Sequence, residues 1–178
     1  ISDGLNMIAT GIDWKAGDNV IVCPELEHPN NVYVWLNLRS RGLEVRTVKP
    51  RDGHMPVDEI VAKIDKRTRV VTVSTVTFAP GFRTDVDRLG RECRSRGVLF
   101  LVDGAQSVSH LRTDVQELGA DFFVFSGHKV FAPTGIGAVY GKKELLDRLP
   151  PWQGGGNMIE DVTFEHTRYN PAPARFEA

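Results

Sequence analysis

The sequence predicts an α/β fold, a three-layer α/β/α sandwich built around a mostly parallel sheet. Short apolar runs rich in β-branched residues alternate with amphipathic stretches along the chain. The apolar runs are hydrophobic on both faces, which is typical of parallel strands covered by helices on either side. With 178 residues and 41% hydrophobic content, the chain can form one domain with a substantial core.

The first four elements alternate between strand and helix. Residues 18–23 (DNVIVC) form a short β-branched run and predict a buried strand. Residues 30–42 carry apolar side chains at helical spacing and end at a glycine, which predicts a helix. Residues 43–49 alternate as a strand does, and residues 56–65 have the acidic first turn that favours a helix.

The middle of the chain continues this alternation. Residues 68–76 (TRVVTVSTV) predict a strand, and residues 85–97 predict an amphipathic helix that ends at a glycine. Residues 98–103 (VLFLVD) are the most apolar predicted strand of the chain. Residues 114–119 predict a short helix.

The last predicted elements lie before a segment rich in glycine and proline. Strands are expected at residues 121–127 and 136–142, and a helix at residues 142–149. The stretch RLPPWQGGGNMI, residues 148–159, is expected to mark the edge of the sheet domain.

Charge and cysteine content exclude several classes of partner. The chain has 22 basic and 23 acidic residues spread evenly, so neither a nucleic-acid surface nor a polybasic membrane contact is expected. The apolar runs are too short to span a bilayer. Two cysteines, Cys23 and Cys93, fit a reducing compartment and predict a cytoplasmic location.

Polar side chains follow three of the predicted strands. His28 lies just past the first, and Asp103 ends the strand at 98–103 with Gln106 close behind. The strand at 121–127 contains Ser126 near its end and is followed directly by His128 and Lys129. Ligands bind beyond the carboxyl ends of strands in such sheets. These side chains therefore predict one site at that edge.

The residue types indicate a particular cofactor. A buried lysine can act as a nucleophile toward an aldehyde, and a buried carboxylate such as Asp103 needs a cationic partner. Serine, histidine and tight glycine turns can hold a phosphate. An aldehyde, a protonated ring nitrogen and a phosphate occur together in pyridoxal 5′-phosphate, and no metal is expected.

Three motifs carry a resemblance to a known family: VDGAQSVSH, DFFVFSGHKVFAPTGIGAVYGKKELL and PPWQGGGNMI. With them the chain resembles the class V aminotransferase superfamily of fold-type I pyridoxal-phosphate enzymes. It is most similar to the cysteine desulfurase and selenocysteine lyase group. The resemblance extends over nearly all 178 residues.

The resemblance implies a role for five residues around the cofactor ring. Lys129 would bind the cofactor as the internal aldimine and then move protons at the substrate Cα. Asp103 would keep the pyridine nitrogen protonated, and Gln106 would hydrogen-bond the ring hydroxyl. Ala105 would lie against one face of the ring and His28 would stack on the other. Lys129 and His28 are the expected catalytic residues.

The resemblance also implies a phosphate site and a division of the chain. Ser126 and His128 would hold the phosphate, and Ser2 falls where relatives have a phosphate-binding threonine. Residues 1–150 would be the cofactor-binding core of the large domain. Residues 151–178 would lead toward the rest of it, with the C-terminal small domain absent.

The resemblance leaves the reaction open. The expected activity is cysteine desulfurase or selenocysteine lyase-like C–S or C–Se cleavage in a homodimer, with a sulfur-acceptor protein as a further partner. The family's persulfide cysteine and substrate-binding arginine lie outside this chain, and Phe78 stands where desulfurases commonly have asparagine. The alternatives are an aminotransferase, an epimerase or a C–S lyase without persulfide chemistry, or a non-catalytic cofactor-binding fragment.

Each candidate also has a plain structural interpretation. Lys129 could be a loop lysine that reaches solvent, Asp103 a helix N-cap or turn residue, and His28 a simple loop histidine. Gln106 and Ser126 are ordinary turn residues when considered alone. The paired VDGAQ and SGHK motifs favour the functional interpretation for the whole set.

Overall fold

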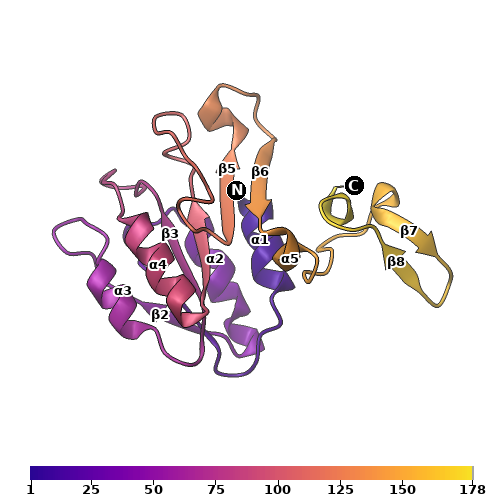
Figure 1. Ribbon diagram of the computed structural model, residues 1–178, viewed down its shortest axis with the longest axis horizontal. Helices are drawn as coiled ribbons and strands as arrows, with labels where there is room; N and C mark the ends of the chain where they lie inside the picture. Colours follow the sequence, from indigo (N-terminus) through magenta and orange to yellow (C-terminus); the bar gives the residue numbers. More distant parts are fainter. Residues whose placement is uncertain (178) are drawn as a thin grey trace.

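A six-stranded sheet lies at the centre of the structure, a computed structural model that describes residues 1–177 (Figure 1). The strand order is β2-β1-β3-β4-β5-β6, and β6 alone runs antiparallel to its neighbour. The strands are β1 (Asn19–Val22), β2 (Glu44–Thr47), β3 (Thr68–Ser74), β4 (Leu99–Asp103), β5 (Phe122–Ser126) and β6 (Gly137–Gly141). The predicted mostly parallel sheet is confirmed.

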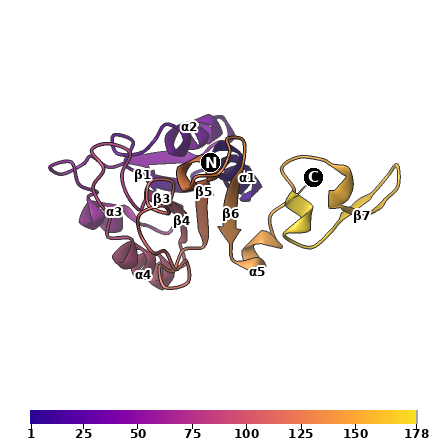
Figure 2. The ribbon, with the colours of Figure 1, turned by 90° about the horizontal axis from the view of Figure 1, so that it is seen from above.

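Helices cover both faces of this sheet. Figure 2 shows α1 and α2 on one face and α3 and α4 on the other. The helices are α1 (Ser2–Gly11), α2 (Asn30–Asn37), α3 (Val57–Lys63), α4 (Val86–Arg96) and α5 (Lys143–Leu146), with 3-10 turns η1 (Leu38–Arg41), η2 (Gly127–Val130), η3 (Gly156–Met158) and η4 (Ala174–Phe176). The three-layer sandwich is therefore confirmed. Within residues 1–177, no helix has both the length and the apolar character needed to cross a membrane.

Alternating strand residues form two separate cores. Leu101 packs with α1 and α2 on one side of the sheet, whereas Phe100 and Val102 pack with α3 and α4 on the other. Trp35 of α2 is fully buried in the first core. Because consecutive side chains of a strand point to opposite faces, a strand buried on both sides must be apolar throughout.

Three parts of the chain differ from the sequence prediction. Residues 114–119 form a single turn, so the predicted helix is wrong. The Asp114 side chain caps this turn by accepting from the backbone N–H groups of Gln116 and Glu117, and Gly119, at a φ of +66°, ends it before a second turn can form. Helix α1 had not been predicted. An antiparallel hairpin of β7 (Ile159–Val162) and β8 (Thr167–Tyr169), also not predicted, extends away from the main sheet (Figure 1). The domain boundary at residue 150 stays a prediction.

Gly90 offers a direct test of the packing between α4 and the turn that precedes β5. A Cβ atom added at Gly90 would lie 2.2 Å from the carbonyl oxygen of Leu118. Alanine normally favours a helix, but the backbone here leaves no space for the added atom. We expect Gly90→Ala to lower the free energy of unfolding by about 1–3 kcal/mol in urea denaturation. Ser95→Ala, at an exposed position of the same helix, is the control, and equal or greater stability of Gly90→Ala would contradict this packing.

Candidate functional site

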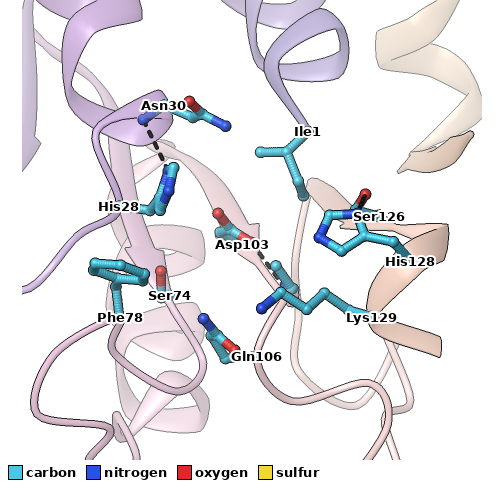
Figure 3. A pocket seen from close by; sticks show the side chains of 11 residues that line it. Ile1, His28, Asn30, Ser74, Phe78, Asp103, Gln106, Ser126, His128 and Lys129 are labelled. Carbon is cyan, nitrogen blue, oxygen red and sulfur yellow. Dashed lines mark hydrogen bonds between the residues drawn. The ribbon is translucent and has the colours of Figure 1, made fainter. Parts of the chain in front are cut away.

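The carboxyl ends of the parallel strands surround a cavity of about 170 Å³ (Figure 3). The loop after β1, the end of β3, the turn after β4 and the segment β5–η2 all contribute to its wall. The structure brings seven of the eight residues predicted from the sequence to this cavity: His28, Asp103, Ala105, Gln106, Ser126, His128 and Lys129.

Ser2 lies elsewhere. It is the first residue of α1 and lines a neighbouring hollow, which shares Ser126 with the cavity. The structure therefore does not bring Ser2 into the same cavity as Lys129. Its assignment to a phosphate stays a prediction.

Lys129 belongs to the 3-10 turn η2, which follows β5 without a linker. Its side chain extends toward Asp103 and Gln106 in Figure 3. Lys129 is exposed, and Phe131, two residues further on, is 97% exposed, so the expectation of a buried lysine is wrong for this structure. The turn after the strand, and not burial, directs the amine into the cavity.

Gly127 explains how this turn can form. A Cβ atom at Gly127 would lie 2.7 Å from the Ile136 side chain, and the Gly127 N–H donates to the Ile136 carbonyl at 2.8 Å. Only glycine allows this close contact between the start of η2 and the residue that precedes β6. The contact holds the backbone that leads into Lys129.

Asp103 is a buried carboxylate at the end of β4, with an exposed fraction of 3%. Its Oδ1 accepts a hydrogen bond from the Ala105 N–H at 2.8 Å. Burial raises the pKa of Asp103, and this hydrogen bond opposes that shift only in part. Within residues 1–177, no lysine, arginine or histidine forms a salt bridge with Asp103.

His28 and Phe78 form the opposite wall. The two rings meet edge to face, with centroids 4.8 Å apart. His28 Nδ1 accepts from the Asn30 N–H at 3.3 Å, which leaves Nε2 as the protonated nitrogen of the neutral ring. The Phe78 N–H donates to the Leu26 carbonyl at 3.0 Å, so the two loops are also joined through the backbone.

Ser126 and His128 lie beside the lysine. The Ser126 Oγ and the His128 Nδ1 are 2.8 Å apart and share a hydrogen bond. A hydroxyl and an imidazole beside a glycine turn form a set of neutral or cationic donors that suits a phosphate.

Three further residues lie at the cavity or directly behind it and were not predicted from the sequence. Ser74 and Asn30 line the cavity, and Glu27 hydrogen-bonds Ser74 from behind it. Ser74 is the last residue of β3 and the register partner of Asp103. The strand-end rule applied to residues 68–76 would have found it, whereas no sequence signal distinguishes Asn30 from an ordinary helix-start residue.

The residues present fit pyridoxal 5′-phosphate. A buried carboxylate that forms no salt bridge within residues 1–177 suits a protonated ring nitrogen, because the ring would supply a positive charge beside it. Lys129 is free to meet an aldehyde, and the Ser126–His128 pair is suited to the phosphate.

Comparisons with known proteins identify the family of the chain. A profile of the Aminotransferase class-V family matches residues 2–178. A cysteine desulfurase of Synechococcus elongatus is 47% identical, over 99% of this chain and 29% of the relative. The crystal structure of the Escherichia coli cysteine desulfurase CsdA superposes with a TM-score of 0.94 at 36% identity, over 99% of this chain and 45% of that one.

A third similar protein, C-DES, is named a cystine C–S lyase. One of its structures, a mutant with glycine covalently linked to the PLP cofactor, has a TM-score of 0.89 at 25% identity, over 99% of this chain and 48% of that one. Another holds its reaction product cysteine persulfide. The chain thus spans less than half the length of each of these three relatives. On the match across residues 2–178, the chain belongs to the class-V aminotransferase family.

Proposed function

We propose that this chain is the cofactor-binding core of a pyridoxal-phosphate enzyme that cleaves the C–S bond of cysteine, or the C–Se bond of selenocysteine, as a desulfurase does. One observation carries the proposal: Lys129 extends into a cavity whose far side holds Asp103, a buried carboxylate outside every salt bridge of residues 1–177. The similarity to cysteine desulfurases over 99% of the chain supports the same conclusion.

The bound cofactor would supply an electron sink that withdraws charge from the substrate Cα. Lys129 Nζ would bind the aldehyde and later move the Cα proton. Asp103 would hold a proton on the ring nitrogen, because a buried carboxylate is stabilised by an adjacent positive charge. Ala105 and His28 would confine the ring between them, and Gln106 would hydrogen-bond its hydroxyl.

The phosphate group and the partners belong to the same proposal. Ser126, His128 and Ser2 would bind the phosphate. The partners would be an amino-acid substrate, a second copy of the chain in a homodimer, and a protein that accepts sulfur. A cytoplasmic location is included, supported by two cysteines that are both free and buried.

Phe78 favours a second candidate function, a C–S lyase that releases sulfide without a persulfide cysteine. Its phenyl ring lines the cavity where an asparagine would donate a hydrogen bond, and phenyl has no such donor. The similarity to C-DES, named a cystine C–S lyase, supports C–S bond cleavage, although the product of that enzyme is cysteine persulfide and not sulfide. An aminotransferase or an epimerase would need the same cofactor residues.

The products distinguish these reactions. We expect the full-length protein, incubated with cysteine and a thiol acceptor, to release one alanine for each sulfur atom that the acceptor receives as a persulfide. Pyruvate, ammonia and sulfide in equal amounts would instead indicate a C–S lyase. Transfer of the amino group to a keto acid would indicate an aminotransferase. Cofactor binding with no turnover would leave only a binding domain and would overturn the proposed activity.

A further inference from the structure

A buried carboxylate behind the cavity has no role in the function proposed above. Glu27 directly precedes His28 and has an exposed fraction of only 4%. Its partners are hydrogen-bond donors on two elements, and none of them is a cation. Its Oε1 accepts from the Ser74 N–H at 2.7 Å, and its Oε2 accepts from the Ser74 Oγ at 2.5 Å and from Asn31 Nδ2 at 2.9 Å.

The hydrogen bonds around Glu27 all run in one direction. The Trp35 indole N–H donates to Asn31 Oδ1 at 3.3 Å, and the Thr72 hydroxyl donates to the same oxygen at 2.7 Å. Because an indole N–H can only donate, the amide oxygen of Asn31 must face Trp35, and its NH₂ group must face Glu27. Glu27 is therefore the final acceptor in a buried series of hydrogen bonds whose donor-to-acceptor direction is fixed.

This series of hydrogen bonds reaches the wall of the proposed cofactor cavity. Ser74 lines the cavity and is paired in register with Asp103 on the neighbouring strand. Glu27 fixes both the backbone N–H and the hydroxyl of Ser74. It also links the end of β3 to the first turn of α2, and Glu27 and His28 both lie in the loop between β1 and α2.

We propose that Glu27 is a positioning residue of this cavity, which sets the direction of the Ser74 hydroxyl and the place of the His28 ring. The inference rests on the proposed cofactor function. With Glu27 ionised, the Ser74 hydroxyl donates its proton inward to Oε2. With Glu27 protonated, the Oε2 proton is donated to Ser74 Oγ, and the serine's own proton is free to point into the cavity.

The switch between these two arrangements falls near neutral pH. Burial raises the pKa of Glu27 to about 7, although its hydrogen bonds with Ser74 and Asn31 favour the ionised form. The titratable groups around it are Asp103 on β4, Cys23 at the end of β1, and His28 next in the chain. Burial raises the pKa of the Cys23 thiol to about 12, so this group stays neutral through the transition.

Glu27→Gln tests the inference because it keeps the shape of the side chain and reverses one end of its polarity. The amide NH₂ of glutamine must face a donor, either of Ser74 or of Asn31. In the full-length wild-type protein loaded with pyridoxal phosphate, we expect the cofactor band at about 420 nm to change with pH, in both absorption and circular dichroism. The midpoint of this transition should lie near pH 7. We expect Glu27→Gln to lack this transition and to bind the cofactor about tenfold more weakly.

Two further variants separate positioning from general stability. Ser74→Ala retains the backbone hydrogen bond to Glu27 and removes the hydroxyl, so it should also lack the transition. Asp18→Asn is the control, because Asp18 is another buried carboxylate, with an exposed fraction of 8%. It directly precedes β1, at the amino ends of the parallel strands and away from the cavity. This variant should keep both the pH transition and the cofactor affinity.

The outcomes distinguish this inference from the proposed function. A transition that persists in Glu27→Gln with unchanged affinity would overturn the role of Glu27 and leave the cofactor assignment intact. If Glu27→Gln does not fold, a transition that persists in Ser74→Ala would overturn the role equally. Wild-type protein that binds no pyridoxal phosphate would overturn both proposals together.

Discussion

Lys129→Ala is expected to reduce the turnover of the full-length protein by at least about a thousandfold, because the variant lacks the amine that binds the aldehyde and moves the Cα proton. The same variant should lose the absorption at about 420 nm that borohydride abolishes in the wild type. Its free energy of unfolding should change by less than about 0.5 kcal/mol, since Lys129 is exposed and belongs to none of the salt bridges of residues 1–177.

The measurements are absorption spectra, product formation and urea denaturation on the same preparations. Lys143→Ala is the matched control, because Lys143 is an exposed lysine in a surface ion pair with Asp147, 2.6 Å away. It should retain the band and the turnover. A Lys129→Ala protein that keeps the band after extensive dialysis would show that another amine holds the cofactor.

Asp103→Asn is expected to separate function from stability. The amide keeps the shape of the side chain, and its oxygen can still accept from the Ala105 N–H. The neutral amide no longer favours a protonated ring nitrogen, so turnover should fall on the order of a hundredfold. The unloaded protein should instead become more stable by about 1 kcal/mol at pH 8, because the variant removes a buried charge that forms no salt bridge within residues 1–177.

The pH dependence gives the sign of this effect. Burial raises the pKa of Asp103 in the folded state above its unfolded value. The folded protein therefore retains this proton longer than the unfolded chain, and stability is lost as the pH rises from the unfolded pKa toward the folded one. Urea denaturation of the unloaded protein at pH 4 and pH 8 should show a smaller loss for Asp103→Asn than for the wild type. An equal loss would mean that Asp103 is compensated in the folded state.

Much of the fold could be predicted because its strands are apolar on both faces. Strands β3, β4 and β5 lie within the predicted ranges, and the wholly apolar run of residues 98–102 leaves no alternative to a central position in the sheet. The turn at 114–119 could not be distinguished from a helix by its sequence, because Asp114 caps it as the first turn of a helix is capped, and Gly119 ends it after one turn. The β7–β8 hairpin lacks the regular alternation that marks a half-buried strand.

The sequence by itself determined that His28, Asp103, Gln106 and Lys129 lie together, since each follows a strand and parallel strands end at the same edge. Only the tertiary structure decided how each side chain is placed. It leaves Lys129 exposed and Asp103 buried, and it puts Ser2 in a neighbouring hollow. It also connects Glu27 to Ser74, 47 residues away. Burial and hydrogen-bond direction depend on contacts between segments that are distant in the sequence. The spacing of residues within one segment does not determine these contacts.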